Sequence, residues 1–159
     1  MKYFILTALT ALITGGAMIG GAVAQTQEIK THGVHHVGLA VKDLQTTLRF
    51  FKDALDFKEV GGKPDYPSVF VSDGTIMVTL WQADEGAVAF DRKKNIGLHH
   101  LAFKLGSFED LDAMHKKIKD WPGVEIEFSP EDVGEGPAKH MIFYEPGGIR
   151  LEFIVVPES

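Results

Sequence analysis

The sequence predicts an α+β protein of two tandem βαβββ modules that form a cupped mixed sheet with helices on the outside. The dipeptide His-His occurs twice, at His35-His36 and at His99-His100, and each copy opens an alternating apolar run. Each run is followed by a stretch with helical spacing and then by three further strand-like runs. Two copies of one unit bury their apolar faces against each other, which leaves related faces open to a shared cavity.

The first module is expected over residues 33–82. Alternation predicts a strand at Val34–Val41, and Asp43 is a suitable N-cap for a helix at Leu44–Leu55. The elements expected after this helix are a strand at Phe57–Val60, a turn around Gly61–Pro64, and strands at Ser68–Ser72 and Thr75–Gln82 on either side of an Asp-Gly turn.

The second module is expected over residues 98–156 and repeats that order. The polar, Gly-containing stretch Ala83–Gly97 connects the two copies. The predicted elements are a strand at His99–Leu105, a helix at Phe108–Trp121 capped by Ser107, strands at Val124–Phe128 and Lys139–Tyr144, a turn at Glu145–Gly148, and a strand at Ile149–Val156. Residues 33–156 are therefore expected to form a single domain.

The parity of each strand separates a packed face from an open one, because successive side chains point to opposite faces. His36 shares its face with Gly38 and Ala40, whereas His35 is expected on the packed face with Leu39. His100 likewise shares a face with small Ala102, and His99 is expected on the packed face. His36 and His100 therefore occupy equivalent positions on the open faces of the two modules.

Three further polar residues belong to the open face of the second module. Glu152 falls opposite in parity to the packed residues of the last strand, and His140 and Tyr144 share one face of the strand before it. Two imidazoles and one carboxylate with coordination positions left over compose a mononuclear metal site open to substrate. We therefore predict that His36, His100 and Glu152 bind a divalent metal ion.

Structural roles for these residues remain open alternatives. Histidines at strand starts often form hydrogen bonds at a surface, and Glu152 could pair with Arg150 on the same face. His140 could be a surface histidine near Lys139, and Tyr144 could be a packing aromatic. Placement of His at the same step of both modules favours the metal-binding alternative.

Composition excludes several classes of function. The formal net charge of -6 argues against binding of a nucleic-acid backbone. The sequence contains no cysteine, so thiolate chemistry, disulfides and iron–sulfur ligation are excluded. A small-molecule substrate is the expected partner.

The N-terminal segment belongs to a different class of sequence. Lys2 is followed by a charge-free apolar stretch that ends Ala22-Val23-Ala24 before polar residues. This pattern predicts a signal peptide over residues 1–24 and a periplasmic or secreted protein with no membrane contact after cleavage. An uncleaved membrane anchor is the alternative, because the apolar run is longer than a typical signal core.

Three stretches of the chain resemble the vicinal oxygen chelate superfamily, which includes glyoxalase I, extradiol dioxygenases, fosfomycin-resistance transferases and bleomycin-binding proteins. They are HHVGLAVKDLQTTLRFFKDALDFKEV, GLHHLAFKL and IFYEPGGIRLEF. The resemblance spans residues 33 to 156. It implies the two-module fold, but one scaffold hosts many reactions.

The resemblance also implies metal ligands on the first and last strands of each module. His36, His100 and Glu152 match three of these positions, whereas the strand TIMVTLWQ has Val78 or Thr79 at the fourth, with Gln82 as the nearest alternative. A set of three protein ligands resembles the metal site of the extradiol dioxygenases or of the fosfomycin-resistance proteins. The implied cofactor is one Fe, Mn, Zn, Ni or Co ion.

We therefore expect a secreted metal-dependent enzyme that acts on a small substrate with vicinal oxygens, by a dioxygenase-like or a lyase or isomerase reaction. His140 is the expected catalytic base and Tyr144 a hydrogen-bond donor to the developing anion. The alternative is a non-catalytic small-molecule binding protein of the bleomycin-resistance type. The resemblance further implies a homodimer, in which the site is either intrachain or shared between subunits.

Overall fold

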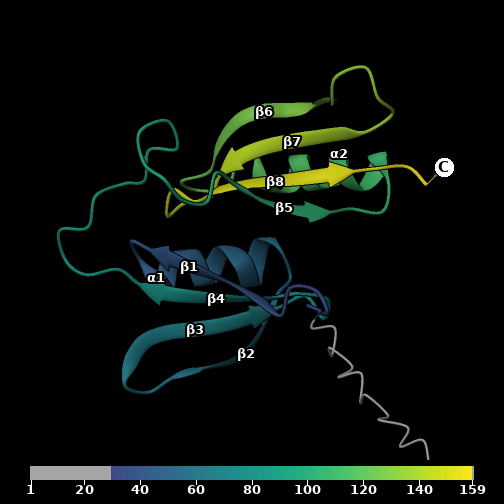
Figure 1. Cartoon of the computed structure of the whole chain (residues 1–159). Coiled ribbons are helices and arrows are strands. Elements are labelled where there is room, and N and C mark those ends of the chain that lie inside the picture. Colours follow the sequence, from purple (N-terminus) through teal and green to yellow (C-terminus); the bar gives the residue numbers. More distant parts are fainter. Residues whose placement is uncertain (1–29, 159) are drawn as a thin grey trace, which may run out of the picture. The chain divides into compact units, whose positions relative to one another are not determined.

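A computed structural model describes residues 30–158 of the chain (Figure 1). The predicted signal at residues 1–24 lies outside the described part. From residue 33 onward the chain forms one compact unit. Within residues 30–158, no helix has the length and apolarity needed to cross a membrane.

The first module contains a four-stranded mixed sheet of strand order β1-β4-β3-β2, in which β1 is parallel to β4. The α-helix α1 is followed directly by a π-helical stretch, η1. Together they end at Ala54, one residue before the predicted end of this helix. The elements are β1 (His36–Val41), α1 (Leu44–Arg49), η1 (Phe50–Ala54), β2 (Lys58–Lys63), β3 (Tyr66–Ser72) and β4 (Met77–Gln82).

The second module repeats this topology, with strand order β5-β8-β7-β6 and β5 parallel to β8. The elements are β5 (Leu101–Lys104), α2 (Phe108–Ile118), β6 (Glu125–Asp132), β7 (Lys139–Tyr144) and β8 (Arg150–Val155). The α+β class and the tandem βαβββ order are thus confirmed, with one separately hydrogen-bonded sheet per module (Figure 1).

Both α-helices begin at the predicted caps. The Asp43 carboxylate accepts a hydrogen bond from the Thr46 backbone N–H at 2.8 Å, and this bond lowers the pKa of Asp43. The Ser107 hydroxyl accepts from the Asp110 backbone N–H in the same way. These contacts satisfy N–H groups that a helix start leaves without partners.

A single apolar core joins the two modules. Its aromatic contacts include Phe50 against Phe143, with ring centroids 5.9 Å apart, and Phe51 against Phe103 at 6.5 Å. Phe50 and Phe51 lie on η1, whereas their partners lie on β7 and β5 of the second module. Because Leu39 and Val41 are buried while Gly38 and Ala40 are exposed, the predicted division of β1 into two faces is confirmed.

Several expectations about strand limits are wrong. The strand expected to end at Phe128, β6, continues to Asp132. The strands begin at His36 and Leu101 rather than at Val34 and His99, so strand alternation does not place His35 or His99 on the packed face. The turn expected at Gly61–Pro64 instead continues β2 to Lys63, because register shifts in the pairing with β3 absorb the glycines.

Candidate metal centre and adjoining cavity

The open face of the second sheet brings together three of the five predicted site residues. Ile142 and Ala102 are the strand partners of Glu152, so His140, two residues before Ile142, and His100, two residues before Ala102, are its diagonal neighbours. His100 Nε2 is 2.9 Å from Glu152 Oε2, and His140 Nδ1 is 2.6 Å from Glu152 Oε1. Glu152 is buried, with 7% of its surface exposed.

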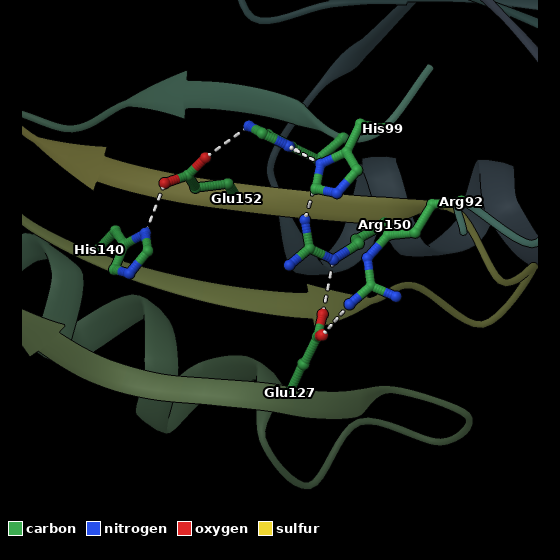
Figure 2. A network of polar contacts seen from close by, with 7 residues as sticks. Arg92, His99, Glu127, His140, Arg150 and Glu152 are labelled. Carbon is green, nitrogen blue, oxygen red and sulfur yellow. Dashed lines mark hydrogen bonds and ion pairs between the residues drawn. The ribbon is translucent and has the colours of Figure 1, made fainter. Parts of the chain in front are cut away.

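These three residues belong to a longer chain of polar contacts, which we call the polar network (Figure 2). From Glu152 the network continues through His100 to His99, whose Nδ1 atoms are 2.8 Å apart, and from His99 Nδ1 to Arg150 Nη1 at 3.4 Å. Its members in order are His140, Glu152, His100, His99, Arg150, Glu127 and Arg92.

Glu127 of β6 holds two arginines at the far end of the network. Arg150 Nε donates to its Oε2 at 2.6 Å, and Arg92 Nη2 donates to its Oε1 at 2.7 Å. Burial by itself would raise the pKa of the Glu127 carboxyl, but the hydrogen bond from Arg150 and the charges of both arginines outweigh this and lower the pKa. Glu127, and not Glu152, is therefore the partner of Arg150.

The network determines which ring nitrogen of His100 carries the proton. Desolvation, followed by the charge of Arg150, lowers the pKa of His99, so this ring is neutral near pH 7. Because Arg150 can only donate, His99 Nδ1 accepts, and the contact with His100 then needs a proton on His100 Nδ1. A neutral His100 consequently directs the Nε2 lone pair at the Glu152 carboxylate.

His100 Nε2 and Glu152 Oε2 are two acceptors only 2.9 Å apart, so they need a cation between them, either a proton or a metal ion. An imidazole Nε2 and a carboxylate are ordinary ligands of divalent transition metals, and a hydrogen bond at Nδ1 is the usual support of a metal-binding histidine. His100 and Glu152 therefore fit two positions of a metal centre. Within residues 30–158, no group of three His, Cys, Asp or Glu is arranged to hold a metal ion.

His36 lies at the start of β1, on the open face of the first sheet. It is exposed, and its Nδ1 is 2.9 Å from Nδ1 of His35. This contact repeats the one between His99 and His100, so the two modules present their second histidine in the same manner. Within the described chain, His36 does not join His100 and Glu152 in a common ligand set.

The strand register identifies the residue at the fourth ligand position. Thr79 pairs with Gly38 on the first sheet as Glu152 pairs with Ala102 on the second, so Thr79 is the counterpart of Glu152. The Thr79 hydroxyl accepts a hydrogen bond from Trp81 Nε1 at 2.9 Å. The first module thus supplies one histidine and no carboxylate at the positions that the resemblance implies.

Gln82, the alternative for the fourth ligand, has a different role. Its side chain accepts a hydrogen bond from the Leu44 backbone N–H at 2.9 Å and donates to the Lys42 carbonyl at 2.6 Å. Gln82 therefore supports the start of α1, on the opposite face of β4 from Thr79.

A cavity of about 290 Å³ adjoins the arginine end of the polar network. Tyr144, the predicted hydrogen-bond donor, lines this cavity. The three predicted metal ligands and His140 are not among its lining residues. The remaining walls come from β1, the connection between the modules and the turn before β8.

Sequence reasoning missed four members of the polar network as site residues: His99, Arg150, Glu127 and Arg92. Arg150 was considered only as a possible partner of Glu152, whereas its carboxylate partner is Glu127. His99 was expected on the packed face, Glu127 lies on a strand with irregular pairing, and Arg92 lies in the connection. One signal for His99 was present in the sequence. The first histidine of each His-His dipeptide is repeated although only the second is needed as a ligand, which indicates a role for the first. The sequence has no comparable signal for Glu127 or Arg92.

The chain belongs to the Glyoxalase/Bleomycin resistance protein/Dioxygenase superfamily, whose family profile matches residues 33–153. This match covers the first module, all but the last three residues of the second, and every residue of the polar network. It confirms the resemblance to the vicinal oxygen chelate superfamily.

Among characterised proteins, a 2-epi-5-epi-valiolone epimerase from Actinomyces sp. is 27% identical over 171 residues, which cover 89% of this chain and 84% of the relative. A glyoxylase/bleomycin resistance protein/dioxygenase domain from Frankia sp. EAN1pec is 28% identical, with a TM-score of 0.69 over 82% of this chain and 96% of that one. A fosfomycin resistance protein FosX variant from Listeria monocytogenes, crystallised with Mn(II) and 1S,2S-dihydroxypropylphosphonic acid, has a TM-score of 0.65 at 22% identity, over 80% of this chain and 95% of that one. At this identity the FosX likeness concerns the fold alone.

Proposed function

We propose that this protein is a metal-dependent enzyme that acts on a small molecule with two neighbouring oxygen atoms. The single observation that carries the proposal is the buried Glu152 carboxylate, which faces an imidazole nitrogen with each of its oxygens. A buried carboxylate is costly unless cations or donors surround it, and such clusters are typical of functional sites. The epimerase relative, which is 27% identical, supports the proposal.

In this proposal His36, His100 and Glu152 are the metal ligands, and the ion is Fe, Mn, Zn, Ni or Co. When bound, the ion would supply Lewis-acid stabilisation of a deprotonated substrate oxygen. Two imidazoles and one carboxylate leave room for substrate, because a three-ligand site keeps coordination positions open.

His140 is the proposed proton acceptor. Its Nδ1 lies against Glu152, so a proton at Nδ1 leaves the lone pair at Nε2, which is 3.6 Å from Glu131. Two carboxylates therefore flank the ring and balance the charge that it gains with a proton. Phe128 lies parallel to the ring, with the two ring centroids 6.5 Å apart and an interplanar angle of 9°.

Proton transfer is the reaction class that these residues favour, which corresponds to an isomerase, epimerase or lyase. An imidazole held by a carboxylate is the arrangement of a general base. The name of the epimerase relative agrees with this class. A dioxygenase-like reaction is the other class, and the two differ in the need for oxygen.

The substrate class has support from the first sheet. Trp81 lies between Tyr66 and Phe70 on the open face, with ring centroids 5.4 Å and 5.7 Å away. Aromatic faces of this kind pack against apolar or ring-containing ligands. Tyr144 is proposed as the hydrogen-bond donor to the substrate, because its side chain lines the cavity.

We also propose that a second copy of the chain completes the site, so that His36 of one subunit meets His100 and Glu152 of the other. The lack of a three-ligand group within residues 30–158 supports this arrangement. Large apolar side chains in the connection, Val88 and Ile96, are more than 90% exposed and are suited to cover by a partner. A two-fold dimer would form two identical sites.

The test is elemental analysis of protein purified with these metals available. We expect about one metal ion per chain in the wild type. The His100→Ala variant should lose the metal and keep its fold, whereas His115→Ala, which removes a histidine from α2, should retain both. A wild type without metal, and with a melting temperature that a chelator does not change, would instead favour a non-catalytic binding protein.

The reaction class is tested with the loaded protein. Proton transfer predicts deuterium incorporation from solvent into a vicinal hydroxy ketone or a 2-oxoaldehyde without oxygen uptake. The His140→Gln variant should retain the metal and lose exchange by at least about 100-fold. Oxygen uptake with catechols would instead assign the dioxygenase class.

A further inference from the structure

The cavity beside the polar network has positively charged lining residues, although the chain as a whole is negatively charged. Arg92 and Arg150 both line it, and no Asp or Glu of residues 30–158 is among its lining residues. The two guanidinium groups share one carboxylate, Glu127, so the three side chains together carry one excess positive charge. This excess lies in a chain whose formal net charge is -6.

The guanidinium groups retain hydrogen-bond donors for a ligand. Arg150 uses Nε for Glu127 and Nη1 for His99, and Arg92 uses Nη2 for Glu127. Within residues 30–158, Arg150 Nη2 and Arg92 Nη1 have no protein acceptor, yet no buried side-chain nitrogen there lacks a partner. These two nitrogens are therefore accessible, and a planar guanidinium fork matches two oxygens of one anionic group.

The other walls of the cavity define the rest of a ligand. Tyr144 is a further lining residue, and its hydroxyl can donate a hydrogen bond. Phe90 and Leu98 add apolar surface from the connection. A cavity with convergent cationic donors at one end and apolar walls suits a small organic oxyanion.

We infer that this cavity binds the carboxylate, phosphonate or phosphate group of a small, partly apolar molecule, with Arg92 and Arg150 as the anion-binding residues. Arg150 is two residues from Glu152 on the same face of β8, so the proposed anion site and the candidate metal centre adjoin on this strand. The inference rests on the proposed function only where it identifies this anion as part of the substrate. Anion binding itself needs no metal.

The experiment measures binding of benzoate and phenylphosphonate to the metal-depleted protein, in the presence of a chelator, by isothermal titration calorimetry. Benzamide, a neutral molecule of similar shape, is the ligand control. Saturable binding of at least one anion without binding of benzamide is expected, and it should weaken as salt increases. Equal binding of benzamide, or no binding of either anion, would overturn the inference.

Two matched variants assign the binding to the cavity. Arg92→Gln should weaken anion binding by about tenfold, because it removes a charge-assisted hydrogen bond. Lys93→Gln makes the same change of charge at the adjacent exposed residue and should weaken binding by less than about twofold. An equal effect of the two substitutions would mean that only overall charge matters, and the inference would fail.

A second variant serves if Arg92→Gln lowers the melting temperature. Arg150→Lys keeps the charge but loses the planar guanidinium fork. We expect it to weaken anion binding more than Lys93→Gln does and less than Arg92→Gln does. Metal content is measured in parallel on protein without chelator. Anion binding without metal loading would contradict the proposed enzyme alone, whereas metal loading without anion binding would contradict this inference alone.

Discussion

At the scale of single residues, the two His-His pairs adopt the same arrangement of their rings. The two rings are 5.2 Å apart and nearly perpendicular in the first pair and 5.1 Å apart in the second, and both pairs meet through their Nδ1 atoms. In the second pair the contact orients the His100 ring and frees its Nε2 to face Glu152. In the proposed metal centre, the second histidine of each pair would be the ligand and the first histidine would support its orientation.

Glu127 provides a residue-scale prediction about pH. Its folded-state pKa lies below its ordinary value of 4.5, so its contribution to stability is present above that value and is lost as the pH falls through the lowered folded pKa. We expect Glu127→Gln to lower the unfolding free energy by about 2 kcal/mol at pH 7, because it leaves two arginines without their carboxylate. Urea denaturation of both proteins measures this difference.

The same comparison at low pH tests the cause. Once the carboxylate of the wild type is protonated, the two proteins should differ by less than half of the neutral-pH value. A difference that stays constant down to pH 3 would show that packing, and not the charge of Glu127, accounts for the loss.

At the scale of elements, the turn between β7 and β8 is fastened to α1. Glu145 in this turn is almost fully buried, and its carboxylate accepts a hydrogen bond from the Thr47 hydroxyl at 3.0 Å and one from the Ile149 backbone N–H at 3.0 Å. Thr47 belongs to the first module and Glu145 to the second. The contact therefore fixes the modules to each other beside the start of β8, where Arg150 lies.

Removal of the Thr47 hydroxyl should test this contact between elements. We expect Thr47→Val to cost about 2 kcal/mol of unfolding free energy, because it leaves a buried carboxylate with one donor fewer. Thr47→Ser, which keeps the hydroxyl, should cost less than about half as much. Equal losses for the two variants would assign the effect to packing of the methyl group.

At the scale of the whole molecule, the sequence predicted the order of the elements and the open faces of the four strands that contain or directly follow His36, His100, His140 and Glu152. Parity alone was sufficient to group Glu152 with His140 and His100, because alternation in a regular strand does not depend on its neighbours. The position of Glu127 was not predictable, since the register between β6 and β7 is shifted twice. Whether His36 joins the other two ligands depends on packing between modules and between copies, which no local pattern encodes.

The N-terminal segment gives a prediction that concerns the whole chain. We propose that residues 1–24 are a cleaved signal and that the protein is periplasmic or secreted. Expression of the full chain in a bacterium should yield, in the periplasmic or secreted fraction, a protein that begins at Gln25. Intact-mass measurement decides the point, because an uncleaved anchor would instead leave the full-length mass in the membrane fraction.

The proposed sharing of the site between two subunits makes the sharpest prediction about the assembly. In a two-fold dimer with one His36→Ala chain and one His100→Ala chain, one site lacks both histidines. The other site receives His36 from the second chain and His100 from the first, and is therefore intact. Each variant alone should bind no metal, since every site of its homodimer lacks one ligand.

Refolding an equimolar mixture of the two variants should consequently restore metal. Random pairing places half of all chains in mixed dimers, each with one intact site, so we expect about one quarter of the wild-type metal content. The matched control is an equimolar mixture of His100→Ala with Glu152→Gln, whose lost ligands belong to the same half of the site. In these mixed dimers each site lacks one ligand, so no metal should return. If the His36 and His100 variants likewise fail to complement each other while both refold as dimers, the ligands belong to one chain, and a change in the packing of its two modules would have to bring His36 to Glu152.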